Sequence, residues 1–170
     1  MKKLILLSVI LIVGCDPEPE VVEDCNGELG GTAVLDECGI CGGDALSCEQ
    51  PELFVFNQSE AQAFYFFNTV TINDEKISPS DWVGAFNGDV CVGVRQWDTS
   101  KCGSGICDLP AMGDNENPET VGYLMAGEIP TFKIYDASEN AYYDAVASEN
   151  IAWSYNGTNI IESLNAITNP

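Results

Sequence analysis

Cysteines and carboxylates are the side chains in this sequence whose types and spacing could support chemistry. The 170 residues include 8 Cys, 27 acidic and 6 basic residues, and no histidine. Without histidine the chain cannot assemble a Ser-His-Asp triad, a Cys-His nucleophile or a histidine-ligated zinc site. The chemistry that remains is oxygen-ligated cation binding, hydrolysis by paired carboxylates, and the chemistry of cysteine itself.

Acidic side chains recur between Asp98 and Pro130, where glycines and prolines predict a long insertion of loops. Such oxygen-rich loops suit calcium, which takes about six to eight oxygen ligands. A solvated acidic loop is the alternative interpretation. Calcium is the only cofactor that the sequence suggests, and its candidate ligands are Asp98, Asp108, Asp114, Glu116 and Glu119.

Paired carboxylates could hydrolyse glycosidic bonds if two of them lay about 5 to 9.5 Å apart across a cleft. The candidates for such a pair are Asp81, Asp89 and Asp98. A domain this small leaves little room for a cleft, so the sequence favours a protein that is not an enzyme. We assign no catalytic residue.

Four aromatic residues are candidates for a sugar-binding platform, because sugars present apolar faces to aromatic rings. The alternative is that they are ordinary aromatics of a core or of a sheet surface. The four residues are Trp82, Trp97, Tyr123 and Trp153.

The charge balance restricts the partners of the protein. Its net charge of −21 repels nucleic acid and anionic lipid surfaces. The same charge favours cations, cationic partners or simply a well-solvated surface. We therefore expect no nucleic-acid partner.

The first 14 residues have the pattern of an export signal. Lys2 and Lys3 supply positive charge, and residues 4–13 form an apolar run too short to span a membrane. Gly14 before Cys15 resembles the lipobox of bacterial lipoproteins, in which the cysteine is diacylated and becomes the first mature residue; an ordinary cleaved signal is the alternative. The resemblance implies that the lipid on Cys15 contacts a membrane. It implies a location in the cell envelope, exposed to the periplasm or to the cell surface.

Residues 15–24 are expected to hold the lipid anchor and a tether. Prolines alternate there with acidic residues, and this pattern favours an extended chain whose charges repel one another. The segment would act as a spacer between the membrane and the rest of the protein.

Residues 25–48 contain four cysteines with the spacing C-x12-C-x2-C-x6-C. Three interpretations compete: a zinc site with four thiolates, a thioredoxin-like redox pair, and disulfides that hold a small loop-rich module. The lack of nearby basic residues and of a strand-helix context favours disulfides, whose pairing the spacing leaves open. These cysteines are Cys25, Cys38, Cys41 and Cys48.

The run from Asp36 to Cys48, DECGICGGDALSC, resembles the C-G-x-C-G-G-D-x-x-x-C segment that closes the cysteine-rich domain of secreted ADAMTS-type proteins. The module from Asp24 to Cys48 is also similar to the short D-C-x-G-x-x-G-G-T-A repeats found near thrombospondin type 3-like repeats in large secreted proteins of environmental bacteria. The resemblance implies an extracellular spacer. The D-x-D-x-D-G ladders with which thrombospondin type 3 repeats bind calcium are missing from this run.

Three cysteines lie further along the chain. The spacing of Cys102 and Cys107 predicts a small disulfide loop, which would leave Cys91 as a buried free thiol. Alternatively, Cys91 could pair with that loop, or a cysteine could pair with the N-terminal module. Once Cys15 is lipidated, seven cysteines remain, so one has no partner within the chain.

Residues 51–168 are predicted to form one β domain. Its clearest element is a hairpin from Asp81 to Trp97, because Asn87-Gly88 between two apolar runs predicts a type I′ turn. With that register one face holds the core residues, Val83, Ala85, Val90, Val92 and Val94.

The remaining strands are predicted from short aromatic and β-branched runs between turn signals. They are expected at residues 53–56, 63–67, 69–72, 131–135, 141–146, 151–155, 158–161 and 164–167, and the runs at 63–67 and 69–72 could be two strands or one long bent strand. The predicted fold is mainly β, an antiparallel β-sandwich of the jelly-roll or immunoglobulin-like type. A small disulfide-rich module and the lipoprotein signal segment precede it.

Residues 61–161 resemble repeat-type β domains in large secreted or surface proteins of environmental bacteria, which implies a location and a fold class but no activity. The leading hypothesis is a non-catalytic, lipid-anchored extracellular binding or adhesion module for a glycan or a surface protein. The alternatives are a structural subunit of a cell-surface assembly and a small carboxylate-based glycoside hydrolase. The oligomeric state is left open. Any binding surface is expected at the Trp97 end of the hairpin.

Overall fold

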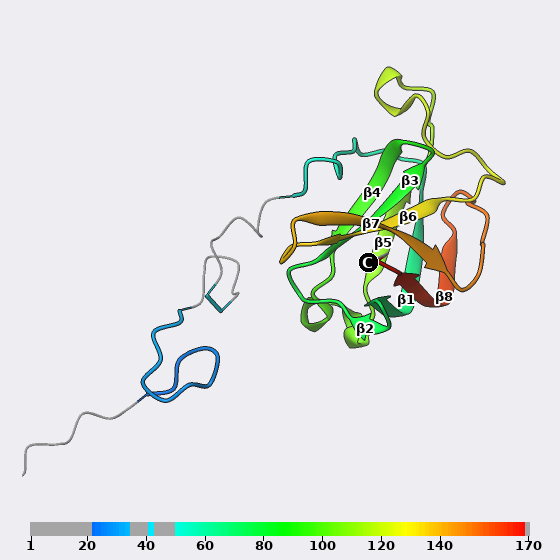
Figure 1. Ribbon diagram of the computed structural model, residues 1–170. Helices are drawn as coiled ribbons and strands as arrows, with labels where there is room; N and C mark the ends of the chain where they lie inside the picture. Colours follow the sequence, from blue (N-terminus) through cyan, green and yellow to red (C-terminus); the bar gives the residue numbers. More distant parts are fainter. Residues whose placement is uncertain (1–21, 35–40, 43–49, 169–170) are drawn as a thin grey trace, which may run out of the picture.

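The computed structural model describes residues 22–34, 41–42 and 50–168 (Figure 1). This part of the chain is mainly β, as predicted, and contains no α-helix. Three short 3-10 turns, η2, η3 and η4, span Thr99–Lys101, Gly103–Gly105 and Pro118–Thr120. The strands are β1 (Gln62–Ile72), β2 (Glu75–Lys76), β3 (Trp82–Asn87), β4 (Val90–Gln96), β5 (Asp108–Met112), β6 (Thr131–Asp136), β7 (Ala141–Ala147) and β8 (Thr158–Ala166).

The strands form one mixed sheet in the order β2-β1-β8-β7-β6-β3-β4, with β5 also paired to β1. Most neighbours are antiparallel, but β1 and β8 run parallel, from Phe64 opposite Thr158 to Ile72 opposite Ala166. The C-terminal strand therefore lies inside the sheet, between β1 and β7. The strand pairing is that of a single curled mixed sheet rather than the expected antiparallel sandwich, because β8 returns to β1 instead of building a second sheet.

The curl brings β4 against β5 at Gly93. A Cβ atom on this residue would lie 1.7 Å from the carbonyl oxygen of Pro110 in β5. Only glycine permits so close an approach of two backbones. Pro110 itself is tolerated because β5 pairs with β1 at the margin of the sheet, where a missing backbone N–H breaks no inner ladder.

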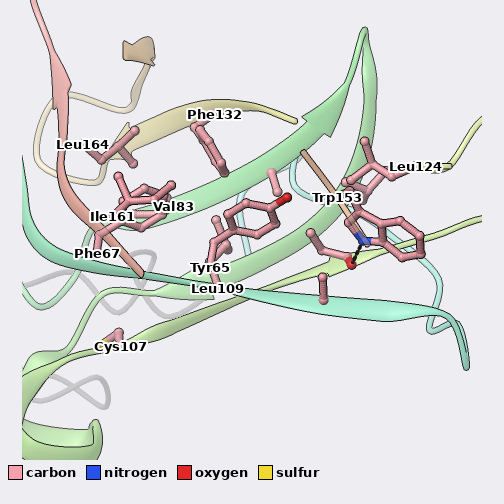
Figure 2. Packing of buried hydrophobic residues seen from close by; sticks show 14 of the residues in the cluster. Tyr65, Phe67, Val83, Cys107, Leu109, Leu124, Phe132, Trp153, Ile161 and Leu164 are labelled. Carbon is pink, nitrogen blue, oxygen red and sulfur yellow. Dashed lines mark hydrogen bonds between the residues drawn. The ribbon is translucent and has the colours of Figure 1, made fainter. Parts of the chain in front are cut away.

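The inner side of the curled sheet encloses the main core (Figure 2). Tyr65 and Phe67 of β1 meet Phe132 of β6 edge-on, with ring centroids 5.7 and 5.2 Å apart. Each large apolar side chain buried there contributes roughly 1.5–3 kcal/mol relative to exposure. Other members with no exposed surface are Val83, Leu109, Leu124, Ile134 and Leu164.

The predicted hairpin is present as β3 and β4, but its register differs from the prediction. Asn87 pairs with Val90, so Gly88 and Asp89 are the loop residues, and an irregularity between Ala85 and Phe86 leaves Val92 as an extra residue. A bulge of this kind reverses the facing of the residues beyond it. Of the predicted core residues, Val83, Ala85 and Val92 are in the main core, Val94 packs on the outer face, and Val90 is 40% exposed.

Several predicted strands are confirmed with altered bounds. The runs expected at 63–67 and 69–72 lie in one strand, β1 (Gln62–Ile72), and most of the runs expected at 158–161 and 164–167 lies in one strand, β8 (Thr158–Ala166). The turn at Asn73 and Asp74 has positive φ at both residues, 52° and 66°. Three predictions are wrong. Residues 53–56 and 151–155 adopt no strand, and the insertion from Asp98 to Pro130, expected to be loops, contains a core strand, β5.

Residues 50–57, which we call the strap, cross the outer face of the sheet before β1 begins; Figure 1 draws them in teal beside β3 and β4. Phe54 is fully buried against Phe86, Tyr135 and Tyr142, with ring centroids 5.8, 6.5 and 5.4 Å away. Gly84 makes room for this ring, since a Cβ there would lie 2.9 Å from it. Phe54 thereby covers a second, outer cluster that includes Phe86, Cys91 and Val94.

In residues 22–34 the carboxylate of Asp24 organises the backbone. It accepts hydrogen bonds from the amides of Asn26, Glu28 and Ala33 at 2.9, 3.0 and 3.2 Å. These bonds, that from Glu28 first, lower the pKa of Asp24. Gly31 lies so close that a Cβ would meet the Asp24 carboxylate at 2.0 Å. A disulfide joins Cys25 to Cys41, one of the pairings that the sequence left open.

Several predictions fall outside the described residues. They are the signal at residues 1–14, lipidated Cys15, most of the tether at 15–24, and the cysteines Cys38 and Cys48, which were predicted to form disulfides. No helix in the described part of the chain has the length and apolar character that a membrane span requires.

Candidate ligand-binding groove

A groove of about 610 Å³ lies on the outer face of β1 and β8. Side chains of β1 alternate between the core and the outside, so Phe64 and Phe66 point outward and stay half-buried. The parallel register places Thr158 beside Phe64 and Ile160 beside Phe66. Ile160 is 65% exposed. The floor of the groove is therefore aromatic and aliphatic.

The other wall of the groove is the loop between β4 and β5. This loop contributes Gly103 and Ile106, and Ile106 is 36% exposed. A disulfide between Cys102 and Cys107 closes it, the first of the arrangements considered above, and Cys107 is fully buried in the main core. The disulfide, whose Cys107 end is buried in the core, therefore fixes the loop that carries Ile106 at the groove.

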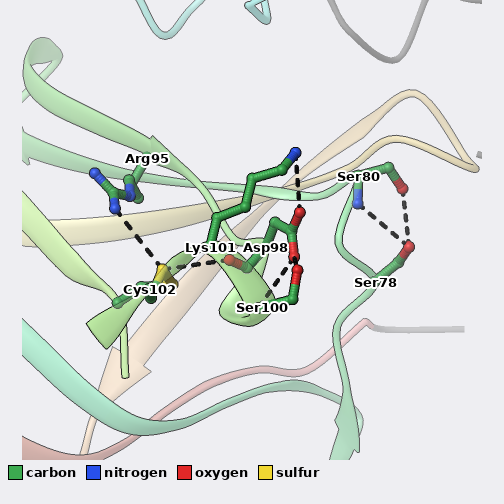
Figure 3. Close-up of polar contacts among 8 residues, drawn as sticks. Ser78, Ser80, Arg95, Asp98, Ser100, Lys101 and Cys102 are labelled. Carbon is green, nitrogen blue, oxygen red and sulfur yellow. Dashed lines mark hydrogen bonds and ion pairs between the residues drawn. A yellow bond between two sulfur atoms is a disulfide. The ribbon is translucent and has the colours of Figure 1, made fainter. Parts of the chain in front are cut away.

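Asp98 starts this loop and holds its first turn (Figure 3). Its Oδ1 accepts hydrogen bonds from the amide and hydroxyl of Ser100 at 3.1 and 2.6 Å, and its Oδ2 lies 3.0 Å from Nζ of Lys101. The Ser100 hydroxyl first, and Lys101 next, lower the pKa of Asp98. This carboxylate therefore serves as a cap for η2.

Polar groups stand at the rim of the groove. Asp108 lines it and pairs with Arg95, whose Nη2 is 3.4 Å from Oδ1. Both side chains are about one-third exposed, so this pair contributes at most about 1 kcal/mol. Asn68 also lines the groove, and its Nδ2 donates to Glu162 at 2.9 Å. The rim thus offers carboxylate, amide and, from Thr158, hydroxyl groups.

The predicted aromatic platform is not present. Trp97, Tyr123 and Trp153 are about 95% buried in the main core, where Nε1 of Trp153 donates to the carbonyl of Ala111 at 2.9 Å (Figure 2). Trp82 is half-buried on the outer face and packs against the cluster beneath Phe54. The three buried side chains cannot stack on a ligand, because the inner side of the sheet is filled by the core.

The predicted calcium ligands are dispersed. Asp98 caps η2 and Asp108 pairs with Arg95, whereas Asp114 accepts a hydrogen bond from the amide of Glu116 at 2.8 Å. Glu119 lies in η4. Within residues 22–34, 41–42 and 50–168, no three acidic or cysteine side chains gather to hold a metal ion. β5 separates the candidates, because it runs through the middle of the segment expected to be loops.

The three acids considered for hydrolysis also have separate positions. Asp81 is 4% exposed, and its two oxygens accept the amides of Ala137 and Ser78 at 2.9 and 2.6 Å. Burial first, and the charge of Asp136 last, raise the pKa of Asp81. Asp81 borders a polar hollow of about 470 Å³, whereas Asp89 occupies the hairpin loop and Asp98 caps η2.

Comparison with protein-family models, with curated proteins and with solved structures gave no match. The groove is therefore interpreted from its own residues.

Sequence analysis missed Phe64 and Phe66 as site residues, although it placed them in a strand. A signal was present in the run from Gln62 to Phe67, to which both residues belong. In that run aromatic residues occupy both faces of the strand, whereas a half-exposed strand usually carries polar residues outside.

Proposed function

We propose that the protein is a non-catalytic binding module whose β domain takes a neutral glycan in the groove over β1 and β8. The observation that supports this proposal is the pair of half-buried rings, Phe64 and Phe66, in an apolar groove with a polar rim. Aromatic rings contact the apolar faces of sugars, while a few polar groups orient the hydroxyls.

Charge favours a neutral ligand over an acidic one. The chain has a net charge of −21, and Asp108 and Glu162 lie at or beside the rim. The negative charge of the protein would repel anionic sugars but not neutral ones.

We also propose that the binding domain is displayed from the cell envelope by a lipid on Cys15. The lipobox-like Gly14-Cys15 and the disulfide-closed loop of Cys25 and Cys41 support an extracellular anchor and spacer. The tether and the cysteine module would hold the β domain away from the bilayer.

The test is a glycan array probed with residues 16–170, as wild type and as Phe66→Ala. We expect binding to neutral sugars, lost at least tenfold in Phe66→Ala. Val146→Ala is the matched control, because Val146 is 75% exposed on β7 and does not line the groove. A calcium chelator should leave glycan binding on the array unchanged.

Two outcomes would contradict the proposal. The first is the absence of neutral-glycan binding; capture of an envelope protein lost in Phe66→Ala would then assign the groove to a protein partner. The second is glycan binding that Phe66→Ala leaves intact, which would place the sugar elsewhere.

A further inference from the structure

Apolar contacts hold the strap to the sheet, since Pro51 is buried and Phe56 is partly buried against both the main core and the outer cluster. Phe54 is fully buried, whereas its neighbours Leu53 and Val55 are 56% and 68% exposed. The backbone amide of Phe54 donates a hydrogen bond to the backbone carbonyl of Pro51 at 2.8 Å, within the strap itself. This bond shapes the strap but does not attach it to a strand.

Few hydrogen bonds join the strap to the rest of the domain. The amide of Leu53 donates to the hydroxyl of Tyr142 at 3.2 Å, and the amide of Asn57 donates to that of Tyr123 at 2.6 Å. The Asn57 side chain also donates to the carbonyl of Glu119 at 3.2 Å. By contrast β1, which follows, is paired along its length to β8. Segments with few buried contacts open at lower free energy than the sheet to which they attach.

Cys91 lies in the cluster that the strap covers. It is 6% exposed and is the free cysteine of the described residues. It pairs with Phe86 across β3 and β4, and the Phe86 ring lies directly against Phe54. Burial raises the pKa of this thiol to about 11, so it is protonated and unreactive while covered.

The covalent path along the chain passes through the strap. The cysteine-rich module at residues 25–48 connects to β1 only by way of residues 50–57. A pull on the module therefore reaches Phe54 before it reaches the hydrogen-bonded sheet.

We propose that the strap is a releasable cover: tension applied through the N-terminal module withdraws Phe54 and exposes Cys91 and its aromatic surroundings while the sheet stays folded. Release would free the chain from Pro51 to Gln58, up to the buried and hydrogen-bonded Ser59, at most about 28 Å of extended backbone. This device is independent of the glycan groove, which lies over β1 and β8.

Thiol labelling of the full-length protein in increasing denaturant tests the proposal. A maleimide is used, and labelled Cys91 is quantified by mass spectrometry of its peptide. In the wild type, we expect the free energy of the opening that allows Cys91 to be labelled to fall less steeply with denaturant than the free energy of global unfolding. The reason is that release of the strap exposes less surface. A denaturant dependence equal to that of global unfolding would overturn the proposal.

Two substitutions sharpen the test. Phe54→Ala should speed the labelling of Cys91 at least tenfold, whereas Leu53→Ala, in the same segment with an exposed side chain, should leave it within about twofold. Equal rates in the two variants would also overturn the proposal. If Phe54→Ala fails to fold, the wild-type denaturant dependence still decides.

Force spectroscopy addresses the tension itself. With the full-length protein pulled from its two ends, we expect a step of at most about 28 Å at a lower force than unfolding of the sheet. A record in which the first extension of the β domain is unfolding of the whole sheet would contradict the device.

Discussion

Asp81 is a buried carboxylate whose two oxygens each accept a backbone amide, from Ser78 and from Ala137. An asparagine side chain has one acceptor oxygen and one donor NH2 group. In Asp81→Asn the NH2 group would therefore face one of the two backbone N–H groups and leave it without an acceptor. We expect the free energy of unfolding to fall by about 1–3 kcal/mol. Denaturant unfolding measures this, with Asp89→Asn in the exposed hairpin loop as the matched control. A loss equal to that of the control would contradict the role given to Asp81.

The same residue has a predicted pH signature. Because burial raises its pKa, ionisation of Asp81 costs more in the folded than in the unfolded state. Its stabilising contribution is therefore present below the ordinary pKa of 3.8 and is lost as pH rises through the raised pKa. The stability difference between wild type and Asp81→Asn should grow as pH falls toward 3.8, which unfolding curves at several pH values measure. A stability difference that shrinks as pH falls would contradict this prediction.

Asp24 should behave in the opposite way. Its pKa is lowered by the backbone amides of Glu28, Ala33 and Asn26, so its contribution is present above pH 3.8 and is lost as pH falls through the lowered pKa. The glycines between Asp24 and Gly31 each have a local structural role. Gly27 and Gly30 take positive φ, 81° and 74°, and Gly31 leaves space for the carboxylate.

At the scale of elements, closure of the curl depends on Gly93. Gly93→Ala would place a methyl group 1.7 Å from the carbonyl oxygen of Pro110, so β4 and β5 must move apart. We expect a loss of roughly 1–3 kcal/mol or more in unfolding free energy. Gly103→Ala is the control, since a Cβ there meets nothing within 4 Å. Equal stability of the two variants would show that β4 and β5 are not packed as described.

The disulfide of the groove wall gives a further prediction. Replacing Cys102 and Cys107 by serine removes a short loop closure, with an expected loss of about 2 kcal/mol. Because Ile106 lies within the loop, glycan binding should weaken in the same variant. Denaturant unfolding and the array measure the two effects. Unchanged binding would show that Ile106 is not part of the ligand contact.

Local patterns predicted most of the paired strands, because alternation and turn residues are local properties. The Asn87-Gly88 signal located the hairpin, but the bulge at Val92 depends on how β4 fits the curled sheet and has no local signature. Pro110 concealed β5, since proline normally argues against a strand. The parallel pairing of β1 with β8 joins segments far apart in the chain, which no local pattern reports.

The site was harder to predict than the strands. Tryptophans are common in sugar sites, but three of the four predicted aromatics fill the core, and Phe64 and Phe66 face outward instead. Exposure depends on which face of each strand the curl encloses. The strap shows the same limit, because Leu53–Phe56 has a strand composition yet crosses the sheet as a cover.

At the scale of the whole molecule, the dispersed positions of the acidic side chains predict that calcium does not change the stability of the β domain. A cation that bound the native state at 100 times its Kd would stabilise it by about 2.7 kcal/mol. Because the acidic side chains of residues 50–168 form no metal cluster, we expect thermal unfolding of the β domain to be the same in calcium and in chelator. A calcium-dependent rise in Tm would contradict this dispersion.

The central claim is that neutral glycans bind over β1 and β8. Its most direct test is a set of two-dimensional NMR spectra of residues 16–170, titrated with a neutral hexasaccharide that is positive on the array. We expect shifts concentrated at Phe64, Phe66, Ile106 and Ile160, with the signals of Val146 unchanged. Shifts confined to the polar hollow beside Asp81, or no shifts at all, would contradict it.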